Sequence, residues 1–199
     1  MTRGLRLLAA AAAIVWMPAA AHADWKPVEK IEHYRVSGSS GIDLYRSIGE
    51  NGPQVGVGRA IAFTDFKLLW SRDYSPQPDG SCTLVSAHPS LTIIYRLPKA
   101  SGDMPAATRR LWETFVNGVA AHEKVHGEFM VDLVKAIEAT SVGLSAPNNP
   151  DCQKVRAELQ SRLGPLSQEQ RRRSREFDQV ELTDGGNVHR LVLALVNGG

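Results

Sequence analysis

The sequence predicts an α+β fold, with a small antiparallel sheet in the N-terminal half followed by a long helix and further antiparallel helices. The first half of the chain is rich in short extended runs separated by glycine and proline. Residues 103–142 instead show the apolar spacing of one amphipathic helix, and helical patterns recur after a turn at residues 144–150. Strands gathered ahead of the helices, rather than alternating with them, are typical of the α+β class.

The predicted strands are enriched in β-branched and aromatic residues, and Gly56 and Gly58 are positions where a bulge is expected. A short helical pattern spans residues 42–48, and Pro89 separates the last two extended runs. These patterns place most of the sheet before residue 98. The extended runs are residues 31–37, 55–70, 83–87 and 91–97.

The long helix is predicted to start near Asp103 and Pro105 and to stop at Gly143. Its apolar residues recur at alternating spacings of three and four, which marks one buried stripe. His122 and His126 fall in register with that stripe, at positions where apolar side chains would be expected. The stripe consists of Trp112, Phe115, Val119, Phe129, Leu133 and Ile137.

The rest of the C-terminal half continues as helices. A second helix is expected over residues 151–163, and Gly164-Pro165 should break it, because proline removes a helical hydrogen bond. A further helical stretch is expected from Ser167 to about residue 177. The apolar segment 188–196 fits either a helix or a strand.

His122, Glu123 and His126 form an H-E-x-x-H motif inside the long helix. Residues four apart share one helix face, so two imidazoles can bind one Zn²⁺ while the glutamate holds a water beside it. Two core histidines with other partners are the alternative, but unpartnered buried polar groups cost about 1–3 kcal/mol each. We therefore predict a zinc site with His122 and His126 as ligands and Glu123 as the general base.

Residues 1–23 have the features of a secretory signal peptide. Arg3 and Arg6 precede an alanine-rich apolar run, and Ala21-His22-Ala23 is a small-x-small cleavage site. The apolar run is too short for a comfortable membrane span, so no stable anchor is expected after cleavage. Residues 24–199 fit a single domain, exported as a secreted or periplasmic protein.

Charge and cysteine content narrow the function further. The chain has 23 Lys+Arg and 21 Asp+Glu, and removing Arg3 and Arg6 with the leader leaves a formal net charge of zero. Nucleic-acid binding is therefore not expected, and the basic run at 171–175 is interpreted as a solvated helix face. Export makes a disulfide between Cys82 and Cys152 the expected state of the two cysteines, rather than two free thiols or thiolate ligands.

With these motifs the chain resembles a bacterial family of predicted secreted zinc-dependent proteases, catalogued as a domain of unknown function. The resemblance implies a zincin-like fold and metal site. The chain departs from the family at Glu181, where relatives often have a threonine that is followed by a His-Gly pair. The matching residues are Tyr34, Gly38, Trp70, Cys82, Leu97-Pro98, Trp112, His122-Glu123, His126-Gly127, Cys152 and Phe177-Asp178.

The third metal ligand is less well defined. The resemblance favours Asp178, because an aspartate recurs at that place in the family pattern. If the two helices beside the turn at 144–150 lie antiparallel, Glu169 comes close to the motif, and Glu181 and His189 stay open as alternatives. Asp132 lies six residues beyond His126 on an unbroken helix and should point away from the metal.

The sequence thus predicts an exported zinc-dependent peptidase that acts on peptide or protein substrates, with Zn²⁺ as its cofactor. An exposed sheet edge beside the motif helix could bind an extended peptide by strand addition. Two other functions stay open: a non-catalytic exported domain that binds a metal or an envelope partner, and a hydrolase of cell-wall peptide amides.

Overall fold

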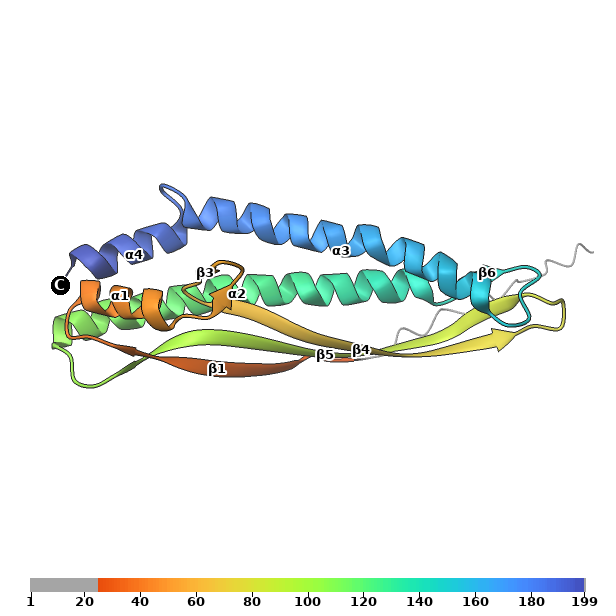
Figure 1. Cartoon of the computed structure of the whole chain (residues 1–199), viewed down its shortest axis with the longest axis horizontal. Helices are drawn as coiled ribbons and strands as arrows, with labels where there is room; N and C mark the ends of the chain where they lie inside the picture. Colours follow the sequence, from red (N-terminus) through yellow and green to blue (C-terminus); the bar gives the residue numbers. More distant parts are fainter. Residues whose placement is uncertain (1–24, 199) are drawn as a thin grey trace, which may run out of the picture.

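The computed structural model of the chain describes residues 25–198, and the predicted signal peptide, residues 1–23, lies outside them. The described part is an α+β structure in which a mixed sheet, helix α2 and the pair α3 and α4 form successive layers (Figure 1). The elements in order are β1 (Val28–Ser37), α1 (Gly41–Asn51), β2 (Gln54–Val55), β3 (Gly58–Arg59), β4 (Phe63–Pro76), β5 (Cys82–Ser101), α2 (Ala106–Ser141), β6 (Ser145–Ala146), α3 (Gln153–Leu182) and α4 (Asn187–Asn197).

The main sheet has the strand order β1-β5-β4, with β6 pairing at the start of β5. Strands β4 and β5 are antiparallel, as expected, but β1 runs parallel to β5, from the pair Val28–Thr92 to the pair Ser37–Ser101. The prediction of a purely antiparallel sheet is therefore wrong for β1. Alternating side chains reveal a half-buried strand, but they carry no information about the direction of its neighbour.

Strand β5 runs without a break through Pro89, where two separate runs were expected. Pro89 pairs with Trp70 of β4 on one side, whereas β1 begins to pair only at Thr92. Strand β5 is therefore a sheet edge at Pro89, and a residue without an N–H group is tolerated there. The long strand β5 runs along α2 (Figure 1).

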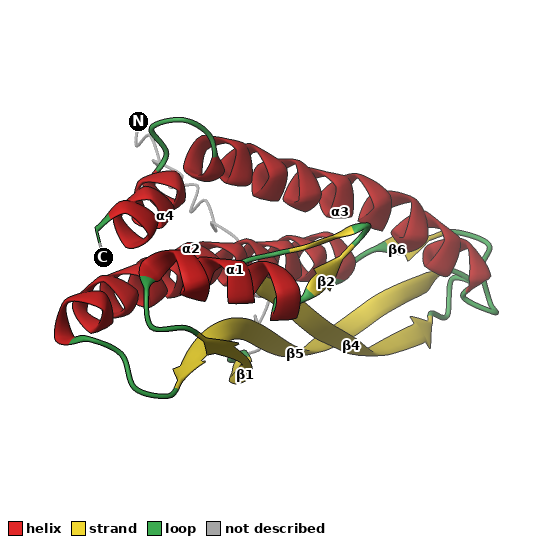
Figure 2. Ribbon diagram, turned by 60° about the vertical axis from the view of Figure 1, so that its left-hand side comes forward, coloured by secondary structure: helices red, strands yellow, loops and turns green. Residues whose placement is uncertain are grey.

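Helix α2 matches the predicted long helix; the first part of its apolar stripe packs in a core cluster with the sheet, whereas Phe129 of the stripe meets Phe177 of α3. Trp112, Phe115 and Val119 are buried together with the β5 residues Ile93 and Tyr95 in the larger of two core clusters. Helix α3 lies antiparallel along the other side of α2 (Figure 2). As a result, α2 is enclosed between the sheet and α3.

Helix α3 is continuous through Pro165, so the predicted break at Gly164-Pro165 is wrong. Pro165 removes the hydrogen bond that the carbonyl of Ser161 would accept, but Ser161 is exposed and water can satisfy that carbonyl. Helix α3 packs along α2, and tertiary packing of this kind can outweigh the local cost of a proline. The continuous helix is what carries residues 178–182 back to the middle of α2 (Figure 2).

Cys82 and Cys152 form a disulfide, which confirms the predicted pairing. It lies in the second core cluster with Leu84, Val155 and Leu159, where the start of β5 meets the start of α3. The segment 188–196, open between helix and strand, belongs to helix α4. None of the helices within residues 25–198 combines the length and apolar composition that a membrane span requires.

Candidate metal centre

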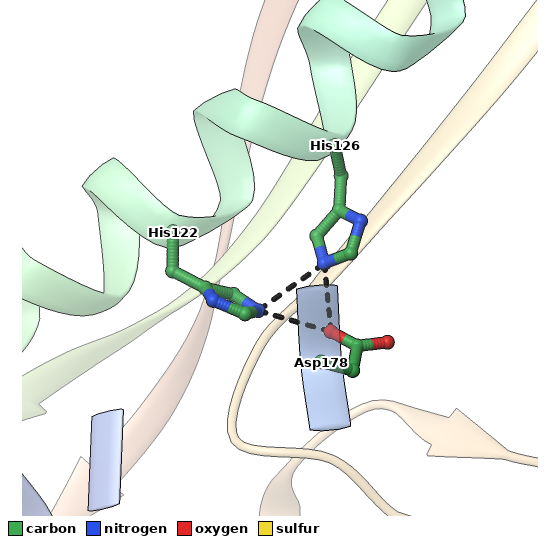
Figure 3. A group of neighbouring side chains, drawn as sticks. All are labelled: His122, His126 and Asp178. Atoms are coloured by element: carbon green, nitrogen blue, oxygen red, sulfur yellow. Dashed lines mark hydrogen bonds and ion pairs between the residues drawn. The ribbon is translucent and has the colours of Figure 1, made fainter. Parts of the chain in front are cut away.

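Helix α2 places His122 and His126 one turn apart on the face that looks toward α3. The side chains are buried, and their Nε2 atoms lie 3.2 Å apart. Both rings point toward Asp178 (Figure 3). Two nitrogens this close cannot both carry a proton without repulsion, so the pair calls for a shared cation or proton.

Asp178 on helix α3 completes a three-atom cluster with the two histidines. Its Oδ1 lies 2.9 Å from Nε2 of His126 and 3.2 Å from Nε2 of His122 (Figure 3). Helix α3 runs back along α2, and this brings Asp178 beside two residues that precede it by more than fifty positions. The structure therefore brings together the motif residues His122 and His126 with Asp178, the third ligand that the family resemblance favours.

The donor set and its spacing fit a tetrahedral metal ion. Tetrahedral zinc with ligand bonds of about 2.0–2.1 Å holds neighbouring ligand atoms about 3.3 Å apart, close to the separations in the cluster. Two imidazoles and one carboxylate are the protein ligands of many catalytic zinc sites, which leave a fourth position for water or substrate. These residues could therefore hold one Zn²⁺ with an open position.

Two of the other sequence candidates lie away from the cluster. Glu169 is exposed and pairs with Arg172 of its own helix, with 2.6 Å between Oε1 and Nη2. Asp132 also points away, as expected for an unbroken helix, and pairs with Arg173 across the α2–α3 interface at 3.0 Å.

Glu181 and His189 take other places. Oε2 of Glu181 lies 3.8 Å from Nδ1 of His122, the ring nitrogen on the side away from the cluster. That nitrogen is buried without a hydrogen-bond partner in the described structure. Metal-binding histidines usually donate the second ring N–H to a carboxylate, and Glu181 lies on that side of the ring, at a distance beyond a hydrogen bond. His189 is near Asp184, at 3.8 Å, and takes no part in the cluster.

Glu123 is buried beside the histidines, and a threonine from the sheet holds its carboxylate. Oγ1 of Thr64 on β4 lies 2.5 Å from Oε2 of Glu123 and 3.1 Å from the carbonyl oxygen of the same residue. Burial raises the pKa of Glu123 above that of a free glutamate, although Thr64 and the two histidines favour the charged form. A carboxyl with a raised pKa accepts and returns protons more readily near neutral pH.

Contacts within the cluster shift the pKa of His126 and the pKa of Asp178. Burial alone would lower the pKa of His126, but the hydrogen bond and charge of Asp178 outweigh it and raise that pKa. Burial would likewise raise the pKa of Asp178, but hydrogen bonds from His122 and His126 lower it to about 2. Without a metal, the cluster therefore favours a charged pair between Asp178 and His126.

Phe177 encloses the cluster on one side. Its ring stacks on His122, with centroids 4.7 Å apart, and meets His126 edge-on at 5.5 Å. Sequence reasoning assigned no packing role to Phe177 and missed Thr64 altogether. An inward-facing threonine in a strand was the one available signal for Thr64, because 59 residues separate it from Glu123.

The cluster opens into a cleft of about 830 Å³ between β4, α2 and α3. Glu123, His122, His126 and Asp178 all line it, and residues 63–66 of β4 form part of its wall. Strand β4 is an edge of the main sheet. The site is therefore next to a free strand edge, inside a space large enough for a segment of peptide.

A family model for a bacterial protein of unknown function, DUF922, matches residues 31–186. The chain belongs to this family. The match includes β1 from Ile31 onward, the other strands, α2 and all of α3, so every member of the three-atom cluster lies within it. No curated protein and no solved structure is similar enough to the chain to match it.

Proposed function

We propose that this protein is an exported zinc-dependent peptidase with a zincin-like site, in which His122, His126 and Asp178 hold the metal. The observation that carries the proposal is the convergence of these three side chains, from two helices, on atoms 2.9–3.2 Å apart. Their position at the bottom of an open cleft favours a catalytic metal over a structural one, because structural zinc sites have four protein ligands.

Glu123 is the proposed general base. Zinc bound at the cluster would lower the pKa of a water in its open position and polarise the substrate carbonyl. Glu123 would take a proton from the attacking water and pass it to the leaving amine as the C–N bond breaks. Thr64 occupies Oε2 of this carboxylate, which leaves Oε1 for the transferred proton.

The sheet edge supports a peptide as substrate. An extended peptide can add to β4 through main-chain hydrogen bonds and so lie across the cleft beside Glu123. The disulfide between Cys82 and Cys152 supports export, since such bonds persist in oxidising compartments. Both features belong to the region that matches the family.

Metal content and cleavage test the proposal together. The purified protein should carry about one zinc per chain, and His122→Ala should lose it. Glu123→Gln should keep the zinc but lose cleavage of unfolded protein substrates. The matched controls are His88→Ala and Glu113→Gln, because both residues are exposed and lie outside the cleft.

The same experiment separates the other functions. Zinc binding without cleavage of any peptide in a broad library would favour a non-catalytic metal-binding domain. Cleavage of cell-wall peptide fragments alone, with loss in Glu123→Gln, would identify a hydrolase of wall amides. Wild-type cleavage by Glu123→Gln would refute the assignment of the general base.

A further inference from the structure

Three arginines line the cleft beside the candidate metal centre. Arg59 comes from β3, and Arg171 and Arg175 come from α3. Arg171 and Arg175 are four residues apart, and Asp178 follows three residues later, so these side chains share one face of α3. The guanidinium groups of Arg171 and Arg175 are therefore on the same side of α3 as Asp178 of the metal cluster.

The arginines of α3 divide into two groups according to their partners. Nη1 of Arg171 donates only to the hydroxyl of Ser167, and Arg175 has no hydrogen bond or ion pair within the described residues. The basic run at residues 171–175 was interpreted from the sequence as one solvated helix face. Its arginines differ instead, because Arg172 and Arg173 pair with carboxylates whereas, within residues 25–198, Arg171 and Arg175 do not. The arginines of α3 that pair with carboxylates are Arg162 with Glu158, Arg172 with Glu169 and Glu176, and Arg173 with Asp132.

The carboxylates in the cleft do not neutralise the three arginines. Glu123 and Asp178 belong to the candidate centre, where a divalent cation would balance their charges. Asp65 is already paired with Arg96, with 3.2 Å between Oδ2 and Nη1. Arg59 donates to the carbonyl oxygen of Gly52 and has no acidic partner among residues 25–198. With a divalent cation bound at the candidate centre, the cleft would therefore carry excess positive charge, although the mature chain has a formal net charge of zero.

We infer that this cleft selects peptide segments rich in aspartate or glutamate, whose carboxylates pair with Arg59, Arg171 and Arg175. The inference rests on the proposed function and specifies its substrate class. Arginine offers planar, bidentate pairing to carboxylates. The free edge of β4 supplies the complementary main-chain contacts, which favours a peptide over another anion.

Binding to the full-length Glu123→Gln protein tests this without requiring turnover. The probe is a fluorescein-labelled peptide of alternating glutamate and alanine, and its counterpart has glutamine in place of glutamate. We expect the acidic peptide to bind at least about tenfold tighter by fluorescence anisotropy, with the difference shrinking in high salt. Arg171→Gln combined with Arg175→Gln should weaken acidic-peptide binding about tenfold.

The matched control is Arg162→Gln combined with Arg172→Gln, which removes two paired arginines from the same helix and should leave peptide binding unchanged. Thermal melting and zinc content verify that each variant is folded. Equal affinity for the acidic and glutamine peptides would overturn the inference. Tighter binding of an inorganic polyphosphate than of the acidic peptide would overturn the assignment to peptides. If acidic peptides bind but are never cleaved, the proposed function fails and the binding inference stands.

Discussion

Thr64 donates a hydrogen bond to Glu123 across the boundary between the sheet and helix α2, with 2.5 Å between Oγ1 and Oε2. Both residues are buried, so little water can replace this bond if it is lost. The contact links the edge strand of the sheet to the proposed general base. Strand β4 could thereby hold Glu123 in place at the strand edge where a peptide would bind.

Removing the hydroxyl of Thr64 should lower kcat about tenfold and leave KM and zinc content nearly unchanged, since the base loses its orientation but the ligands stay in place. Thr64→Val is the test, because it keeps the shape of the side chain. Thr64→Ser keeps the hydroxyl and should restore most of the activity. A kcat in Thr64→Val equal to that of the parent would show that Glu123 does not depend on this contact.

Asp178 should be required for metal binding. Asp178→Ala removes a carboxylate that touches both ring nitrogens, and we expect zinc affinity to fall at least about a hundredfold. Competition with a chelator of known affinity gives the measurement. Asp132→Ala is the control, because Asp132 bridges the same two helices through Arg173 but lies outside the cluster. Equal zinc affinity in the two variants would exclude Asp178 as a ligand.

Stability of the zinc-free protein should depend on pH through His126. Its pKa in the folded chain is raised above 6.5 by Asp178, so the pairing stabilises the fold fully below pH 6.5. The contribution is lost as pH rises through the raised pKa. The difference in Tm between the zinc-free parent and Asp178→Asn should therefore be larger at about pH 6 than at about pH 9.

Acid should also release zinc, because a proton competes with the metal for His126. The competition should begin at a higher pH than it would for an unpaired histidine, since Asp178 favours the charged ring. Zinc retention after dialysis at a series of pH values measures this. For the zinc-free proteins, a difference in Tm between the parent and Asp178→Asn that stays constant from about pH 6 to about pH 9 would contradict the pairing between His126 and Asp178.

The disulfide should contribute to stability without controlling the site. It closes a loop with a sequence separation of 70 residues, and a loop of that size is worth roughly 4 kcal/mol in the chain-entropy model. Replacing Cys82 and Cys152 by serine should lower Tm by roughly 8–16 °C. Zinc content should be unchanged, because the bond lies in the second core cluster. An unchanged Tm would show that the packing of that cluster suffices alone.

Gly127 allows helix α2 to approach the sheet closely above Tyr95. A Cβ at position 127 would overlap Oη of Tyr95, which donates to Glu29. Gly127→Ala should therefore destabilise the protein by about 1–3 kcal/mol. Tyr95→Phe removes the obstructing oxygen, so the double variant should recover part of that loss. Additive effects in a denaturant-based double-mutant cycle would argue against this contact.

Local patterns in the sequence were sufficient to predict the elements that depend on residues close together in the chain. The apolar spacing of three and four predicted helix α2, and the motif within it placed His122 and His126 on one face. Export and cysteine count predicted the bond between Cys82 and Cys152, which the structure contains. The parallel direction of β1 and the continuity of α3 through Pro165 were not predictable in this way. Both depend on which neighbour packs alongside.

The register between α2 and α3 was also not predictable from local sequence patterns. Counting back from the turn brought Glu169 toward the motif, whereas the structure brings Asp178 there. The count assumed that the two helices meet at a tight turn. Instead, β6 and the disulfide at Cys152 attach the connecting segment to strand β5, and α3 starts from that point. Asp178 was nominated through the family resemblance, and its position beside the histidines comes from this attachment.

The sequence by itself determined the long amphipathic helix, its two histidines with the intervening glutamate, and the two cysteines. Those features follow from residue spacing along one segment, where a helix or strand period acts without the rest of the chain. Only the tertiary structure decided that Thr64 holds Glu123, that Asp178 lies beside both imidazoles, and that Arg171 and Arg175 line the cleft while Arg172 is paired elsewhere. These contacts join residues far apart in the chain, and packing of α3 and β4 against α2 sets them.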